Sequence, residues 1–244
     1  MTILHNTLLA AAVALAFAAP AQAVTNGSFE SALTGWSAIG DVSIDNIFVS
    51  QGNVGVLLGT ASVDFEDDAP LLGAGQGNFS GVPAAPVGTV GGVEDFIGLP
   101  MGGLDPDAAN GIAAFEGSAI KQSFAVNAGD RLSFDWQFAT IDPWQGDYAF
   151  VTINQTTYRL GDLAAVSGVQ DSIGFSTPTT FSYTFTASGN VTLALGVVDV
   201  QDFNGTSALL VDNVQLAPVP EPESYAMLLA GLGLIGFAMR RKSA

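Results

Sequence analysis

The sequence predicts an all-β protein, an antiparallel β-sandwich between two apolar terminal segments. Three observations support this prediction. Large apolar residues alternate with small or polar ones in five interior runs, turn-forming residues separate these runs, and no interior stretch sustains apolar residues at helical spacing. Hydrophobic residues make up 48% of the 244 residues, so the chain can bury a core.

The first 23 residues are typical of a secretory signal peptide. Twelve apolar residues, Leu8 to Ala19, come shortly before Ala21 and Ala23, which are small enough for the pocket of a signal peptidase. We expect cleavage after Ala23. The region before Leu8 contains no Lys or Arg, which departs from the usual pattern, and a buried N-terminal helix is the alternative.

The C-terminal segment is typical of a short membrane anchor. The 15 uncharged residues 225–239 would span about 22 Å as a helix, against a hydrocarbon core of about 30 Å. Basic residues next to a membrane helix stay on the cytoplasmic side, so the chain before residue 225 is expected outside. These basic residues are Arg240, Arg241 and Lys242.

This segment resembles the PEP-CTERM sorting signal of Gram-negative bacteria. The resemblance rests on Val219-Pro220-Glu221-Pro222, the short apolar helix and the terminal basic residues, within residues 218–244. It implies that an exosortase recognises Pro220, Glu221 and Pro222, removes the helix, and releases or re-anchors a protein first tethered to the inner membrane. Two prolines keep the recognised segment extended. An ordinary C-terminal anchor is the alternative.

Residues 24–217 are expected to form one β-sandwich domain of about nine or ten strands. Within it, residues 67–111 contain 11 Gly and five Pro, which predicts long surface loops that serve as a ligand-covering flap or a tolerated insertion. The expected strands include residues 120–126, 132–138, 148–154, 181–185 and 191–195.

The charged and reactive residues exclude several functions. Six Lys plus Arg against 23 Asp plus Glu give a net charge of −17, which argues against nucleic acid as a partner. The chain has no Cys, and its one His, His5, lies in the predicted signal peptide. Disulfides, thiolate metal sites and a Ser-His-Asp triad are therefore excluded from the mature domain.

The ends of the domain carry a second resemblance. Residues 26–30 with Gly35-Trp36, and residues 209–216, resemble the first and last strands of galactose-binding-like jelly rolls, the fold of many carbohydrate-binding modules. The resemblance implies that these strands lie side by side and that Glu30 and Asp212 hold a structural Ca²⁺, an ion that takes oxygen ligands. Alternatively, Glu30 is solvated and Asp212 closes a turn.

One interior loop has the composition of a sugar-binding site. In residues 142–148, an indole ring could stack on a sugar while carboxylates and an amide bind its hydroxyls, although Trp144 could instead cap the core. The candidate ligand residues are Asp142, Trp144, Gln145, Asp147 and Tyr148. Trp36 and Trp136 lie in strand patterns and are expected in the core.

Catalysis is not predicted. A glycosidase needs two carboxyls about 5 to 9.5 Å apart, one with a raised pKa, and nothing in the sequence raises the pKa of Asp142 or Asp147. A further acidic group, Asp199, Asp202 and Asp212, is interpreted as a cation site or a solvated rim.

The sequence thus predicts a non-enzymatic, exosortase-sorted protein of the cell surface or extracellular matrix that binds or organises polysaccharide. The alternatives are a permanently membrane-anchored glycan-binding module and a carboxylate-dependent glycoside hydrolase.

Overall fold

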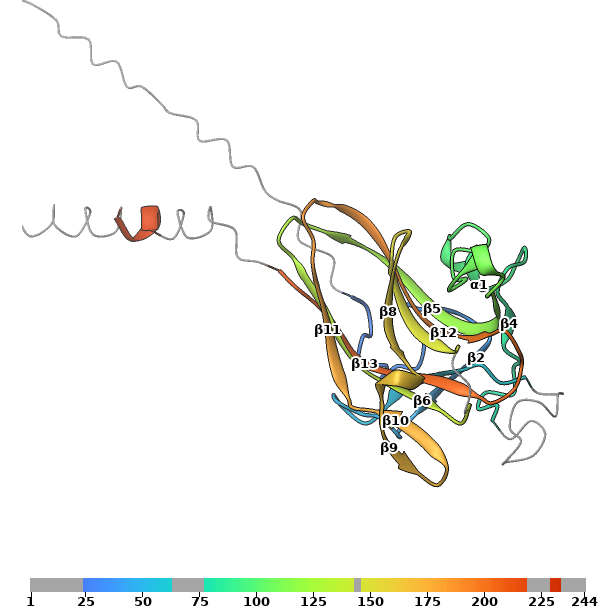
Figure 1. Ribbon diagram of the computed structural model, residues 1–244. Coiled ribbons are helices and arrows are strands. Elements are labelled where there is room, and N and C mark those ends of the chain that lie inside the picture. The colour runs from blue at the N-terminus through green and yellow to red at the C-terminus, as the bar shows by residue number, and fades with distance from the viewer. Residues whose placement is uncertain (1–23, 63–76, 143–145, 219–228, 234–244) are drawn as a thin grey trace, which may run out of the picture.

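The computed structural model describes residues 24–62, 77–142, 146–218 and 229–233 (Figure 1). Residues 229–233, inside the predicted C-terminal helix 225–239, are helical. None of the helices in these ranges combines the length and the apolar character needed to cross a membrane. Several predictions concern residues outside the described ranges: the signal peptide with Ala21 and Ala23, residues 67–76, Trp144, Gln145, Val219, Pro220, Glu221, Pro222, Arg240, Arg241 and Lys242.

Two antiparallel sheets pack face to face (Figure 1), which confirms the predicted fold class. The six-stranded sheet has the order β1-β5-β12-β7-β8, with β4 beside β5. Its strands are β1 (Ser37–Ile39), β4 (Ala85–Pro86), β5 (Ala114–Val126), β7 (Tyr148–Ile153), β8 (Thr156–Asp162) and β12 (Gly189–Val200).

The seven-stranded sheet has the order β2-β3-β13-β6-β10-β9, with β11 also paired to β6. Its strands are β2 (Asp41–Asp45), β3 (Gly55–Gly59), β6 (Arg131–Thr140), β9 (Val166–Gln170), β10 (Ile173–Ser176), β11 (Thr179–Thr184) and β13 (Ser207–Ala217). The described residues therefore contain thirteen strands, more than the nine or ten expected. Very short strands such as β4 leave too few residues for an alternating pattern.

The alternation of β6 shows how the sequence forms the sandwich. Phe134, Trp136 and Phe138 are at most 7% exposed and face the core, whereas Asp135 and Gln137 between them are half-buried on the outer face. The core also contains Leu193, Leu195 and Val197 of β12 and Leu209 and Val211 of β13. Trp36 belongs to the same cluster, so the predicted burial of Trp36 and Trp136 is confirmed.

The predicted first strand is wrong, because residues 25–35 form turns. Asn26 has a φ of 50°, and its side chain binds the backbone of Ser31, Ala32 and Thr34, replacing the partner that a strand would need. The segment nevertheless lies beside the last strand, as the jelly-roll resemblance implies, because the Val214 N–H of β13 donates to its Gly27 carbonyl at 2.8 Å.

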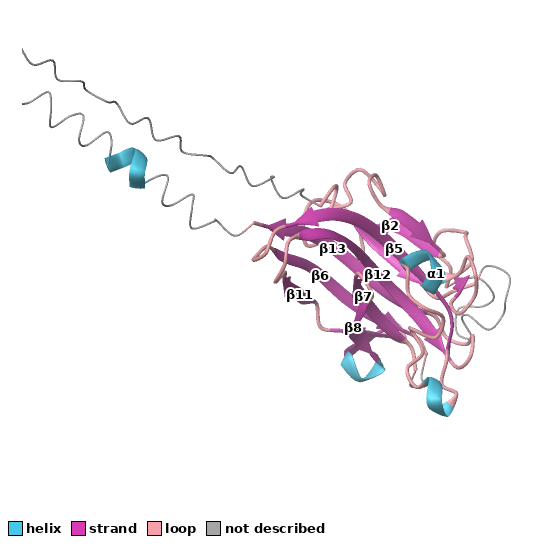
Figure 2. Cartoon of the chain, turned by 90° about the horizontal axis from the view of Figure 1, so that it is seen from above, coloured by secondary structure: helices cyan, strands magenta, loops and turns pink. Residues whose placement is uncertain are grey.

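The prediction of surface loops over residues 67–111 needs a correction for the described part, 77–111. This part contains α1 (Val93–Ile97), which lies against β5 (Figure 2), and a 3₁₀ turn at Ala108–Asn110. Its apolar side chains form a second core on the outer face of the six-stranded sheet. Helical spacing over a five-residue helix is too short to recognise among so many glycines. The buried apolar residues that this segment contributes to the second core are Val87, Val93, Ile97, Leu99 and Leu104.

Candidate functional site

The structure places the described residues of the predicted sugar-binding loop in the interior. Asp142, Asp147 and Tyr148 are 6%, 3% and 5% exposed, so they do not form the exposed binding surface that the sequence predicts. The Asp147 carboxylate accepts hydrogen bonds from the Val200 N–H at 3.0 Å and the Ser207 hydroxyl at 2.6 Å. Asp147 therefore fastens the start of β7 to β12 and β13.

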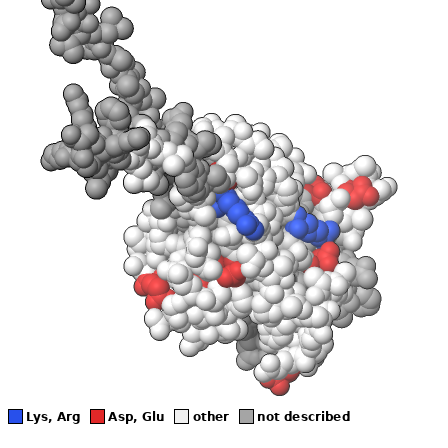
Figure 3. Space-filling model, turned by 90° about the vertical axis from the view of Figure 1, so that its left-hand side faces the viewer, with Lys and Arg blue, Asp and Glu red and all other residues white. Residues whose placement is uncertain are grey.

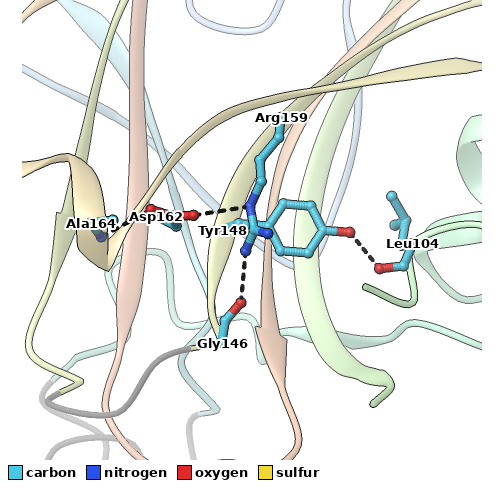
Figure 4. Close-up of polar contacts among 6 residues, drawn as sticks. All are labelled: Leu104, Gly146, Tyr148, Arg159, Asp162 and Ala164. Atoms are coloured by element: carbon cyan, nitrogen blue, oxygen red, sulfur yellow. Dashed lines mark hydrogen bonds and ion pairs between the residues drawn. The ribbon is translucent and has the colours of Figure 1, made fainter. Parts of the chain in front are cut away.

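Tyr148 connects the second core to the sheet (Figure 4). Its hydroxyl donates to the Leu104 carbonyl, and the Arg159 guanidinium lies over its ring, 4.3 Å from the centroid. Arg159 also donates to the Gly146 carbonyl at 3.2 Å and forms an ion pair with Asp162 at 3.3 Å. Burial raises the pKa of the Tyr148 phenol, so Tyr148 stays a neutral hydrogen-bond donor.

Burial also shifts the pKa values of the acidic side chains beside this loop. It raises the pKa of Asp147 and of Asp199, and repulsion between these two carboxylates and from Asp142 and Asp202 adds to the effect. Asp199 is 2% exposed, so the interpretation of Asp199 as part of a solvated rim is wrong. Asp142 and Asp147 are both buried, which limits the access of a sugar ring to either carboxylate.

Asp212 does not belong to that acidic group, and like Glu30 it accepts hydrogen bonds from the loop between β2 and β3. Asp212 Oδ2 accepts from the Ser50 and Gln51 N–H groups, both at 2.7 Å. Glu30 Oε1 accepts from the Asn53 N–H at 2.6 Å and from the Val54 N–H at 3.1 Å. The two carboxylates therefore both hold the loop between β2 and β3.

These hydrogen bonds lower the pKa of Glu30, with the Asn53 backbone N–H as the largest cause. Within the described ranges, no three acidic or imidazole side chains are arranged to hold a metal ion. Calcium at Glu30 and Asp212 stays a prediction.

The most suitable exposed site lies on the outer face of the seven-stranded sheet. A groove of about 520 Å³, which we call the outer groove, runs between the β2–β3 loop and strands β6 and β11. Its volume is within the range of ligand sites, about 300–1,000 Å³. The outer groove is lined by Ile47, Phe48, Val49, Ser50, Asp135, Gln137, Pro178, Thr179 and Thr180.

Hydrogen bonds hold the polar side chains of the outer groove in place. Asp135 accepts from the Thr180 hydroxyl at 2.6 Å and from the Asn213 amide at 2.9 Å, and the Gln137 amide donates to the Ser176 carbonyl at 2.9 Å. Partial burial alone would raise the pKa of Asp135, but its hydrogen bonds outweigh that effect and the pKa lies below its ordinary value. Asp135 is therefore an ionised acceptor at neutral pH.

A smaller apolar cavity of about 110 Å³ lies on the same sheet face. Ile47 contributes to both sites, so an elongated ligand would meet polar groups and then apolar ones. The alternating polar residues of β6 are the signal in the sequence that could have indicated this face. The apolar cavity is lined mainly by Leu57, Phe79, Ala139, Ile173, Phe175, Ala208 and Leu210.

Basic residues are few in the described part of the chain. The described ranges contain three basic residues, Lys121, Arg131 and Arg159, and Figure 3 shows Lys and Arg side chains as separate small patches on a mostly uncharged face. Several acids are buried and hold backbone N–H groups, as Glu94 does for Gly102 and Leu104.

Comparison with solved structures finds similar carbohydrate-binding modules of β-sandwich fold. TmCBM61, solved in complex with β-1,4-galactotriose, is 10% identical, with 80% of this chain and 97% of that chain covered and a TM-score of 0.42. A CBM28 module specific for non-crystalline cellulose is 13% identical, with coverages of 81% and 96% and a TM-score of 0.36. A CBM4 module is 15% identical, with coverages of 77% and 97% and a TM-score of 0.33.

Comparison by sequence identifies the C-terminal segment. No curated protein matches the chain. The family model of the PEP-CTERM protein-sorting motif matches residues 218–242, as the resemblance of Val219-Pro220-Glu221-Pro222 and the basic terminus led us to expect. The chain therefore carries a PEP-CTERM protein-sorting motif that follows an all-β sandwich.

Proposed function

We propose that the protein is an exported, exosortase-sorted component of the cell surface or extracellular matrix that binds polysaccharide without catalysis. The sorting-motif match at residues 218–242 is the observation that carries the sorting part of this proposal. Signal peptidase would cleave after Ala23, and the exosortase would recognise Pro220, Glu221 and Pro222. The membrane helix at 225–239 would hold the precursor in the inner membrane until then.

The outer groove supports polysaccharide as the ligand. Sugars need hydrogen-bonding groups in fixed positions together with apolar surface, and the groove combines the Asp135 carboxylate and the Gln137 amide with the Phe48 ring. The outer groove shares Ile47 with the apolar cavity, and two adjoining sites suit a chain of sugars better than a single ring. This site replaces residues 142–148 as our candidate contact with glycan.

Removal of the sorting motif tests the first half of the proposal. A chain that ends at Pro218 should be exported, but it should form neither the precursor tethered to the inner membrane nor the product of exosortase processing. Fractionation of cells, with and without the exosortase, measures this. A full-length protein that reaches the cell surface in the same form without an exosortase would instead support a permanent membrane anchor.

A glycan array tests the second half. Gln137→Ala should weaken binding to whichever polysaccharide the protein retains, because it removes an amide that lines the groove. Ser123→Ala is a matched control, since Ser123 is an exposed polar residue on β5 of the other sheet. Equal loss in both variants, or none in Gln137→Ala, would exclude the outer groove as the binding site.

A further inference from the structure

A buried group of acids lies at one end of the sandwich, away from the outer groove. We call it the acidic cluster: Glu116 of β5, Asp142 and Asp147 before β7, Asp199 of β12, and Asp202 of the following loop. Glu116, Asp142, Asp147 and Asp199 are between 2% and 8% exposed. Glu116 and Asp199 are direct cross-strand partners in the β5–β12 pairing, an arrangement that is unfavourable for like charges.

Asp199 has an unmet requirement within this cluster. Its Oδ1 atom is buried and has no hydrogen-bond partner in the described structure, whereas Asp147 is held by Val200 and Ser207. Glu116, Asp142, Asp147 and Asp202 all act on Asp199 by repulsion, so this carboxylate lies close to other carboxylates. A buried, unpartnered carboxylate oxygen costs about 1–3 kcal/mol or more, and its presence calls for an ion or another partner.

No basic side chain in the described ranges supplies that positive charge. Of the three basic residues in the described ranges, Arg159 is already bound to Asp162 and to the Gly146 carbonyl. Lys121 donates to the Phe96 carbonyl and lies over the Phe96 ring. Arg131 donates to Ser182. The positive charge that neutralises the cluster therefore comes from solution, as a metal ion or as bound protons.

We propose that the acidic cluster binds a divalent cation of the Ca²⁺ type, with Asp199 and Asp147 as its carboxylate ligands. No three acidic side chains of the described structure already surround one point, so water and main-chain oxygens complete the coordination shell. The ion joins β7 to β12 and relieves the repulsion between neighbouring acids. This site is distinct from Glu30 and Asp212, which lie at the β2–β3 loop.

Thermal unfolding of the purified protein tests this proposal. After treatment with EDTA and dialysis, added CaCl₂ at a hundredfold excess over its Kd should raise the Tm by about 5–10 °C. Asp199→Asn, which keeps the shape of the side chain, should abolish the rise. Glu30→Gln should retain it, because Glu30 lies outside the cluster.

Equilibrium dialysis with ⁴⁵Ca²⁺ provides a readout that does not depend on unfolding. We expect Asp199→Asn to bind one ion fewer than the wild type, and the double variant Asp199→Asn with Glu30→Gln to bind one ion fewer than Glu30→Gln alone. The proposal is overturned if Ca²⁺ leaves the Tm of the wild type unchanged, or if Glu30→Gln rather than Asp199→Asn loses the ion. It is also overturned if Asp199→Asn raises the Tm equally in EDTA and in Ca²⁺, because the cluster then holds protons instead of a metal.

Discussion

Tyr148→Phe separates a structural role from a ligand-binding role. The hydroxyl of Tyr148 donates to the Leu104 carbonyl in the second core, and Leu104 is 1% exposed, so water cannot replace the lost donor. An unsatisfied buried carbonyl costs about 1–3 kcal/mol. The phenyl ring would keep its packing against Phe150 and its contact with Arg159. We therefore expect the free energy of unfolding to fall by about 2 kcal/mol.

Urea unfolding followed by tryptophan fluorescence measures this change, and the glycan array measures binding. Tyr158→Phe is a matched control: its hydroxyl interacts with Tyr183 near the surface, so we expect a loss below about 0.5 kcal/mol. Polysaccharide binding should be the same in both variants. The reasoning fails if Tyr148→Phe is as stable as Tyr158→Phe, or if it loses glycan binding while its stability is unchanged.

Other substitutions test the fold and its pH dependence. Gly27→Ala should lower stability by about 1–3 kcal/mol in urea unfolding, because the new Cβ would lie 1.9 Å from the Val214 carbonyl oxygen. Ile97→Ala should cost about 2–5 kcal/mol and increase proteolysis within residues 87–112, since Ile97 is 3% exposed in the second core. Burial raises the pKa of Asp41 above its value in the unfolded chain, so Asp41 contributes less to stability as pH rises above about 4. The urea midpoint of Asp41→Asn should therefore fall less over this pH range than that of the wild type. The pKa of Glu30 is lowered, so its contribution is present above about pH 4.5 and lost in acid, and Glu30→Gln should lose stability at pH 7 but little at pH 3.

The sheet core could be predicted from local sequence because strand periodicity is a local property. The alternation of residues 132–138 identifies both the core residue Phe134 and the outward Asp135. The turn at residues 127–130 is equally local: Asp130 accepts from the Asn127 N–H at 2.7 Å, and Gly129 has a φ of 95°. Long β-strands separated by turn residues were therefore sufficient to predict the all-β fold class.

Segments whose structure depends on distant partners could not be predicted in this way. The sequence around Asn26 resembles a strand, but in the structure its side chain binds the following turn. Val93 and Ile97 are one helical repeat apart, which is too short a pattern to predict a helix. The candidate site is harder still. Asp135 and Thr180 meet because β11 pairs with β6, and no spacing along the chain reveals that pairing.

The acids show a related limit. Composition suggests a surface covered with negative charge, yet Asp41, Glu94 and Asp212 are fully buried. Each accepts hydrogen bonds from the backbone of a loop, and these bonds fix the conformation of that loop. In the sequence, a carboxylate that holds a loop looks the same as one that binds a ligand, and only its partners in the structure distinguish the two roles.

The intact mass of the protein recovered from the cell surface tests our account most directly. We expect a chain that begins at Val24 and has lost the segment after the Pro220-Glu221-Pro222 motif. A full-length polypeptide that retains both the first 23 residues and the basic C-terminus would contradict export and sorting together.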